Sequence, residues 1–157
     1  MTTTTTTTLS LLVFHGSPLD FIKYRHAVLL LTTYPDNQQS MFHITGPPGE
    51  FKFVEVTGTN PTQSAKLERN IPVVSTVSGD NNSTTTTTTT TISRKMVRDA
   101  CARVKVRNDL PGWNCQNWVG EALSELVKIG CCTEVQRGLA VDGMVDACLE
   151  ARDEEFA

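Results

Sequence analysis

The segment 113–118, which reads WNCQNW, combines a thiol with residues typical of a helix start. Asn114 is a residue type that caps helices, so Cys115 is expected in the first turn of the helix that follows. There the free amide N–H groups and the helix dipole stabilise a thiolate and can hydrogen-bond an oxyanion. The segment therefore predicts Cys115 as a nucleophile for acyl chemistry, which also requires a base within hydrogen-bond reach.

Histidine is the natural base for such a thiol, and the chain has three. His26 falls inside an expected strand over Tyr24–Thr33 and is the predicted base. His43 falls in the next expected strand, Ser40–Thr45; if the two strands pair, it can orient the ring of His26 and fix its tautomer. His15 is interpreted as a strand-end residue, and no metal site is expected, because no partner stands at metal-ligand spacing.

Three further residues are substrate-binding or oxyanion candidates. Tyr24 shares a strand face with His26 by the two-residue period of a strand, so its hydroxyl is expected to face the site. Trp113 stands just outside the helix, where it can wall a substrate pocket. Gln116 lies in the first turn and offers an amide donor, although an exposed polar residue is an equally good interpretation.

A free cysteine is usually a small buried residue on an amphipathic helix, and that interpretation stays open for Cys115. The other cysteines are assigned to packing or helix ends: Cys101, Cys131, Cys132 and Cys148. The odd total of five cysteines, the absence of a C-x-x-C pair and the absence of a secretory signal predict reduced thiols and a cytoplasmic location.

The elements that must position these residues divide the chain into two halves. The first half is rich in Val, Ile, Phe and Thr and predicts five strands: Leu9–Phe14, Tyr24–Thr33, Ser40–Thr45, Phe51–Thr57 and Ile71–Val77. The segment Gly58–Asn70 between the last two is expected to be a loop that can include one helical turn.

The second half has helical spacing. One helix is expected to begin after Ser93, and a second to run from Asn114 to a terminating Gly130. A third is expected to bury one face, formed by Val141, Met144, Val145, Cys148 and Leu149. Strands followed by helices, without alternation, predict an α+β domain whose antiparallel sheet packs against the C-terminal helices.

The length of 157 residues allows one domain, expected over residues 9–151. Residues 1–8 are expected to be a low-complexity threonine tail, 78–92 a flexible threonine-rich insertion and 152–157 an acidic tail. The net charge of −3 argues against nucleic-acid binding, which needs a basic face. No apolar run reaches the ~18–20 residues of a transmembrane segment.

These motifs resemble a known family. The run Tyr24–Ala27 before an apolar strand, the run Phe42–Ile44, and Asn114–Cys115 opening a helix resemble the lecithin:retinol acyltransferase / HRAS-like suppressor family. That family belongs to the circularly permuted branch of the NlpC/P60 thiol enzymes. The PPPDE isopeptidases are similar more distantly. The resemblance implies a permuted papain-like fold.

The same resemblance implies that Cys115 is the nucleophile, His26 the general base and His43 the third, polarising member. The implied activity is thiol acyl transfer or hydrolysis of an amide, ester or isopeptide bond through an acyl-Cys115 intermediate. A small-molecule or peptide acyl substrate is expected, with no cofactor. A non-catalytic protein-interaction module that retains this fold is the alternative function.

Overall fold

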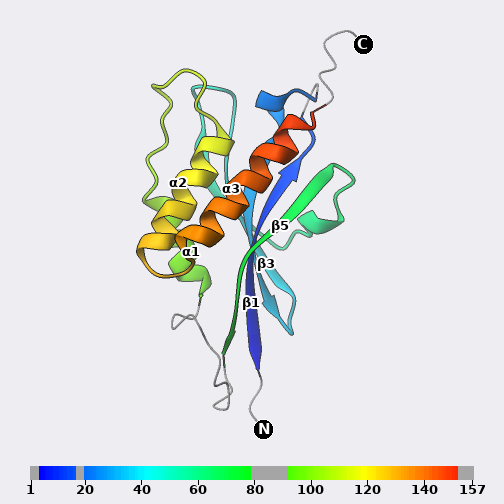
Figure 1. Cartoon of the computed structure of the whole chain (residues 1–157), viewed down its shortest axis with the longest axis vertical. Helices are drawn as coiled ribbons and strands as arrows, with labels where there is room; N and C mark the ends of the chain where they lie inside the picture. The colour runs from blue at the N-terminus through cyan, green and yellow to red at the C-terminus, as the bar shows by residue number, and fades with distance from the viewer. Residues whose placement is uncertain (1–3, 17–19, 79–91, 152–157) are drawn as a thin grey trace.

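A computed structural model of the chain describes residues 4–16, 20–78 and 92–151. Within these ranges the expected α+β class is confirmed, with the strands first and the helices after them (Figure 1). The strands are β1 (Thr5–Phe14), β2 (His26–Tyr34), β3 (Gln38–Thr45), β4 (Lys52–Thr57) and β5 (Leu67–Ser78). The helices are α1 (Arg94–Ala102), α2 (Cys115–Lys128) and α3 (Glu134–Leu149), with 3-10 turns η1 (Ile22–Tyr24) and η2 (Pro61–Gln63).

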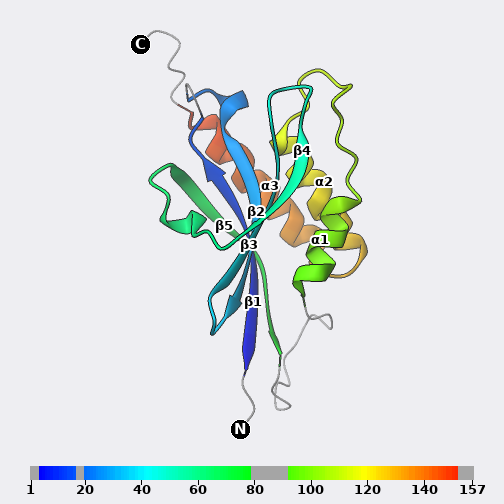
Figure 2. The same cartoon turned by 180° about the vertical axis from the view of Figure 1, so that it is seen from behind.

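The five strands described form one antiparallel sheet in the order β4-β3-β2-β1-β5. Alternate strand residues turn to opposite faces, as the period of a strand requires. One face, which includes Leu11, Leu29 and Phe42, packs with the helices in the main core, and the three helices cover that face (Figure 2). The opposite face carries a smaller cluster that includes Leu12 and Val28.

The first strand begins earlier than its apolar run. Thr5–Thr8, expected in a tail, pair along β2 and β5, with Thr6 opposite Tyr34 and Thr8 opposite Thr32. The tail prediction is wrong for these residues, because a β-branched side chain suits a strand even where it buries no apolar face. Residues 1–3 lie outside the described ranges.

β5, which pairs with β1 on the side opposite β2, also begins earlier in the sequence than expected. β5 starts at Leu67, inside the segment expected to be a loop. Both ends of the range 78–92, expected to be a flexible insertion, belong to the fold: Ser78 is the last residue of β5, and Ile92 is buried, with its amide donating to Thr76 Oγ1 at 3.4 Å. Residues 79–91 and the acidic tail 152–157 lie outside the described part of the chain.

The helix boundaries follow their capping residues. The Ser93 hydroxyl accepts the amide of Met96, so the predicted start of α1 is confirmed. Gly130 has a φ of 82° and lets the Cys131 amide donate to the carbonyl of Leu126 at 2.9 Å, which closes α2 as predicted. Gly130 thus fixes the C-terminal end of α2, the helix that carries Cys115.

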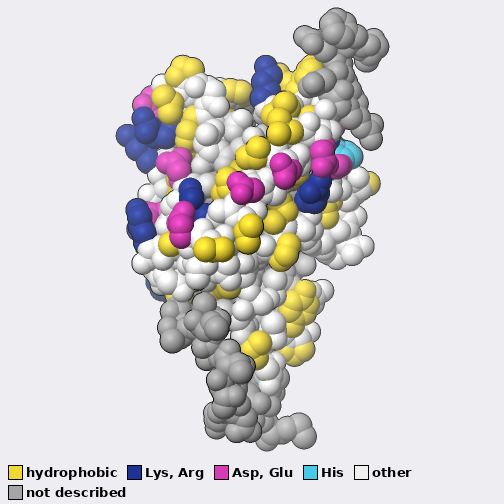
Figure 3. All heavy atoms as spheres, viewed as in Figure 1, with side chains coloured by type: hydrophobic (Ala, Val, Ile, Leu, Met, Phe, Trp, Pro, Cys, Tyr) yellow, Lys and Arg dark blue, Asp and Glu magenta, His cyan; other side chains and the backbone are white. Residues whose placement is uncertain are grey.

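The buried face of α3 differs from the expected one. Val145 and Leu149 are 47% and 63% exposed, whereas the buried residues are Ala140, Met144, Ala147 and Cys148. Figure 3 shows apolar and acidic side chains together along this exposed surface. The small residues face inward because α3 lies close to the sheet: a Cβ at Gly143 would stand 3.2 Å from Ile71 Cδ1. No helix in the described ranges has the length and apolar character needed to span a membrane.

Candidate active site

Cys115 is the first residue of α2, and the turn that carries it is fixed on both sides. The Asn114 side chain accepts the amide of Gln116 at 2.9 Å, and the Asn117 side chain accepts the amide of Asn114 at 3.0 Å. The predicted Asn114 cap is therefore confirmed, and it forms a reciprocal capping box. This box holds the Cys115 side chain towards the start of β2.

The sulfur of Cys115 lies against the backbone on both sides of His26. The Ala27 amide donates to Sγ at 3.4 Å, and Sγ donates to the Arg25 carbonyl at 3.8 Å. The pairing of β2 with β3 begins only at Leu29, so the first residues of β2 can interact with α2 on that side. The opening between the two strands is thus what admits the thiol.

The two strand histidines meet as the sequence predicted. His26 Nε2 lies 2.9 Å from His43 Nδ1, with the rings nearly edge-on. This contact leaves Nδ1 of His26, the ring nitrogen nearer the main chain, to face other groups. Among the described residues the hydrogen-bond partners of Sγ are backbone groups and not the His26 ring.

Burial governs the protonation of these groups. It lowers the pKa of His26 from 6.5 to about 4, with a smaller contribution from His43, so the ring is neutral at pH 7. It also raises the pKa of the Cys115 thiol, although the amides of Ala27, Cys115 and Gln116 act in the opposite direction. Burial therefore opposes the expected resting thiolate, because desolvation raises the pKa of Cys115 more than the backbone amides at the helix start lower it.

Cys115 and His26 line one hollow of about 600 Å³. Its wall is largely aromatic and proline side chains, namely Tyr24, Pro47, Pro48, Phe51 and Trp113. Cys115 itself is 7% exposed, so only a small part of it can be reached through this hollow. A volume of this size accommodates a small-molecule or side-chain group.

The structure places the three substrate-binding or oxyanion candidates differently with respect to the hollow. Tyr24 lies in η1 and not in the expected strand, because β2 begins only at His26, yet it still lines the hollow. Trp113 is buried, donates from Nε1 to Glu121 at 2.9 Å and packs on Phe51, so it forms a wall of the hollow.

Gln116 does not point to the hollow. Its Nε2 donates to the carbonyls of Ile22 at 2.8 Å and Arg25 at 3.1 Å. Both amide hydrogens are used in these bonds, so the expected oxyanion donor is wrong for this side chain. Gln116 instead ties α2 to η1 and to the start of β2.

The sequence reasoning missed a buried ion pair next to the site. Arg25 is 1% exposed and donates from Nε and Nη2 to the two carboxylate oxygens of Asp20, at 2.8 and 2.7 Å. Its Nη1 also donates to the carbonyl of Ala147 near the end of α3, at 2.9 Å. Because Arg25 directly precedes His26, this pair fixes the start of β2 against α3. The only sequence signal was an acid and a base five residues apart between two strands.

The remaining cysteines are buried free thiols, as their assignment to packing predicted. Within the described ranges, no group of three or more histidine, cysteine or acidic side chains could hold a metal ion. The chemistry available to the described site is that of a thiol, a histidine pair and backbone amides.

Fold and site together define an α+β protein with a thiol at a helix start, whose sulfur contacts the strand backbone on either side of His26. The chain belongs to DUF6540, a family of unknown function, which matches residues 13–133. That range contains Cys115 and both site histidines. No match was found among curated proteins or among solved structures.

Proposed function

We propose that this protein is a cysteine-dependent acyltransferase or hydrolase that acts on an amide, ester or isopeptide bond. The observation that supports this most is the position of Cys115 Sγ, between the peptide groups that flank His26, with the His26 ring held by His43. We also propose that the fold is of the permuted papain-like type, on the motifs that resemble the NlpC/P60 enzymes. Five free thiols among the described residues suit a reducing compartment such as the cytoplasm.

In the first step, Sγ of Cys115 attacks the acyl carbon. The S–C bond forms as the thiol proton passes to Nδ1 of His26, and the carbonyl electron pair moves to the oxygen. This requires the His26 tautomer that carries its proton on Nε2, which is the tautomer that donates to Nδ1 of His43. His43 thereby orients the base and stabilises the imidazolium.

The developing oxyanion needs donors at the mouth of α2. The amide of Cys115 at the helix start and the Tyr24 hydroxyl on the wall of the hollow are the donors we assign. Collapse of the intermediate transfers the proton from His26 to the leaving amine or alcohol and leaves a thioester on Cys115. Water, an amine or an alcohol then attacks the thioester, gives its proton to His26, and Sγ takes that proton as it departs.

The direct test is acylation by p-nitrophenyl acetate, followed by intact mass and peptide mapping. We expect one acetyl group on Cys115, none at that position in Cys115→Ala, and slower acylation in His26→Gln. Cys101→Ala is the matched control, because it removes a buried thiol elsewhere and should acylate as the wild type does. Acetylation that maps to another residue, or that is undiminished in Cys115→Ala, would contradict the proposal.

A non-catalytic interaction module is the second candidate, and the raised pKa and small exposure of Cys115 favour it. On that hypothesis the thiol is a packing group. The folded wild type would then acylate Cys115 no faster than it acylates Cys101.

A further inference from the structure

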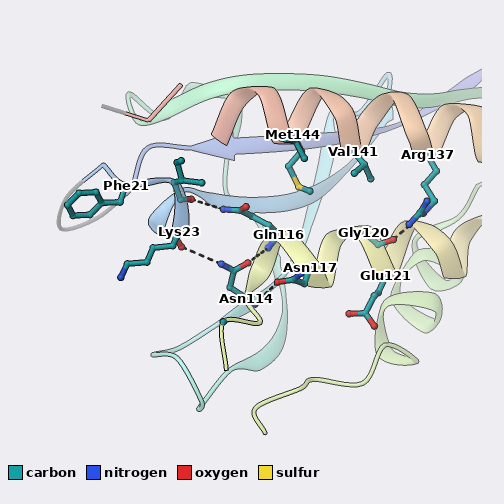
Figure 4. Close-up of a pocket in the computed structure, with 13 residues that line it drawn as sticks. Phe21, Lys23, Asn114, Gln116, Asn117, Gly120, Glu121, Arg137, Val141 and Met144 are labelled. Atoms are coloured by element: carbon teal, nitrogen blue, oxygen red, sulfur yellow. Dashed lines mark hydrogen bonds between the residues drawn. The ribbon is translucent and has the colours of Figure 1, made fainter. Parts of the chain in front are cut away.

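A second and larger hollow opens at the start of α2. It has a volume of about 990 Å³ and lies between η1, the first turns of α2, and α3 (Figure 4). Lys23, Gly112 and Asn114 line both this groove and the hollow that contains Cys115. The two spaces therefore meet at the residues that immediately precede the nucleophile.

The groove differs from the Cys115 hollow in chemistry. Amide side chains line its centre, namely Asn114, Gln116 and Asn117. Figure 4 shows Lys23 at one end and Glu121 with Arg137 at the other, and Met144 reaching in from α3. Each of these amides is engaged in a hydrogen bond within the protein, so the groove presents mainly the charged side chains at its two ends and one apolar wall. The Cys115 hollow, in contrast, is mainly aromatic and proline.

If the proposed function holds, this difference in chemistry assigns the acyl group of a substrate to the Cys115 hollow and its leaving group to the groove. The acyl group stays bonded to Sγ through the thioester, so it must occupy the hollow into which Cys115 opens. The leaving group has to depart and the acceptor has to enter, and the open groove next to the sulfur permits both. The acyl part is therefore apolar and the departing part polar.

We propose that the groove binds a peptide chain, and that the substrate is a peptide or isopeptide amide whose acyl side is apolar. The polar and charged groups of a peptide can pair with the opposite charges of Lys23 and Glu121, and its apolar side chains can pack on the wall that includes Met144. A lipid chain would leave those groups unpaired, and a nucleic acid would meet the Glu121 carboxylate on a chain of net charge −3.

Gly120 allows the groove to be filled without disturbing the core. It lies within α2 and lines the groove, and a Cβ there meets nothing within 4 Å. Gly120→Leu should therefore fold and should project a side chain into the groove. Gly138→Leu is the matched control: it makes the same change within α3, where a Cβ also meets nothing within 4 Å, and Gly138 does not line the groove.

Binding is measured apart from catalysis, on the Cys115→Ala background. The probe is a fluorescein-labelled peptide library with a fixed phenylalanine followed by five mixed residues, read by fluorescence anisotropy. We expect Gly120→Leu to raise the binding midpoint by roughly tenfold or more and Gly138→Leu to leave it unchanged. Turnover by the proteins that retain Cys115 is measured on the same library. There Gly120→Leu should lower kcat/KM by a similar factor, and Gly138→Leu should not.

The outcomes separate this proposal from the proposed function. Binding that Gly120→Leu weakens, without any turnover by the wild type, supports the groove as a peptide site and contradicts the enzyme. Cys115-dependent turnover that Gly120→Leu leaves intact supports the enzyme and overturns the groove. Absence of peptide binding, or displacement of the probe by a fatty amide and not by unlabelled peptide, also overturns it.

Discussion

Cys115 and Cys101 are both buried on helices, yet their surroundings differ. Cys101 lies near the end of α1, and burial together with the Glu55 carboxylate raises its pKa to about 12. Burial raises the pKa of Cys115 as well, but three backbone amides act against that increase. Among the described residues no hydrogen bond reaches the Cys101 sulfur, whereas Cys115 has an amide donor and a carbonyl acceptor.

The comparison shows that burial alone does not distinguish a packing thiol from a reactive one. Both thiols are protonated at pH 7, so the difference lies in what can remove the proton. Cys115 lines the same hollow as His26, whose ring is neutral at pH 7, whereas Cys101 is 0% exposed. A buried thiol with a neutral base next to it can react by proton transfer during attack and needs no resting thiolate.

The strongest test of this comparison removes each sulfur in turn. Cys115→Ala should lower the rate of thioester formation by roughly 10³-fold or more, because the nucleophile is lost. Cys101→Ala should keep the rate and lose about 1 kcal/mol of stability, since it deletes one buried atom. Stopped-flow acylation by p-nitrophenyl acetate and urea unfolding measure the two effects. Equal rate losses in the two variants would contradict the distinction between a reactive Cys115 and a packing Cys101.

The histidine pair is the next largest expected effect. His43→Leu should lower the acylation rate by roughly 100-fold, because the His26 ring loses the acceptor that fixes its tautomer. His43→Asn should recover part of the rate, since its Oδ1 can accept from Nε2 of His26. His43 lowers the pKa of His26, so the low-pH limb of the rate should move above about pH 4 in both variants. A purely structural role for His43 would leave that limb in place.

Protonation of His26 should also lower the free energy of unfolding. The pKa of His26 is about 4 when folded and 6.5 in an unperturbed chain, so the unfolded state binds a proton first as the pH falls. Stability is therefore complete above pH 6.5 and is lost between pH 6.5 and 4, by roughly 2 kcal/mol on going from pH 7 to pH 5. Urea unfolding at both pH values measures this loss.

The matched variant for that experiment is His26→Gln, which cannot titrate. It should keep only the part of the pH dependence that comes from His43, whose pKa burial also lowers. An unchanged pH dependence in His26→Gln would show that another group is responsible.

The smallest expected effect is a difference in alkylation rate. Iodoacetamide should modify Cys115 roughly tenfold faster than Cys101 at pH 7.5, because Cys115 lines an open hollow and Cys101 is 0% exposed. The Cys115 rate should rise further towards pH 9, since its pKa is raised. Peptide mapping over time measures both sites, and equal rates would contradict the comparison.

Much of the fold followed from local signals. The caps at Ser93 and Asn114 and the terminating Gly130 were predicted correctly, because each depends on residues within one helical turn. The five strands were placed by their composition, with errors at their ends. Thr5–Thr8 and the start of β5 were missed, because their pairing depends on neighbouring strands and not on an apolar pattern of their own.

Long-range contacts decided the details of the site. The Gln116 side chain was expected to donate to a substrate, but carbonyls of η1 and Arg25 occupy it. The buried face of α3 was misplaced for a similar reason, because close approach to β5 selects small residues. The carbonyls that bind Gln116 and the strand that approaches α3 both lie far from these residues in the sequence.

The sequence by itself determined that a cysteine begins a capped helix and that two histidines stand on adjacent strands, because caps and strand patterns are local. Only the tertiary structure decided that Sγ of Cys115 lies against the backbone of His26 and that the two histidine rings meet. It also decided the protonation: the helix start favours a thiolate, but burial by the sheet and the other helices opposes it more strongly. Desolvation depends on everything packed around a group, and no local pattern encodes it.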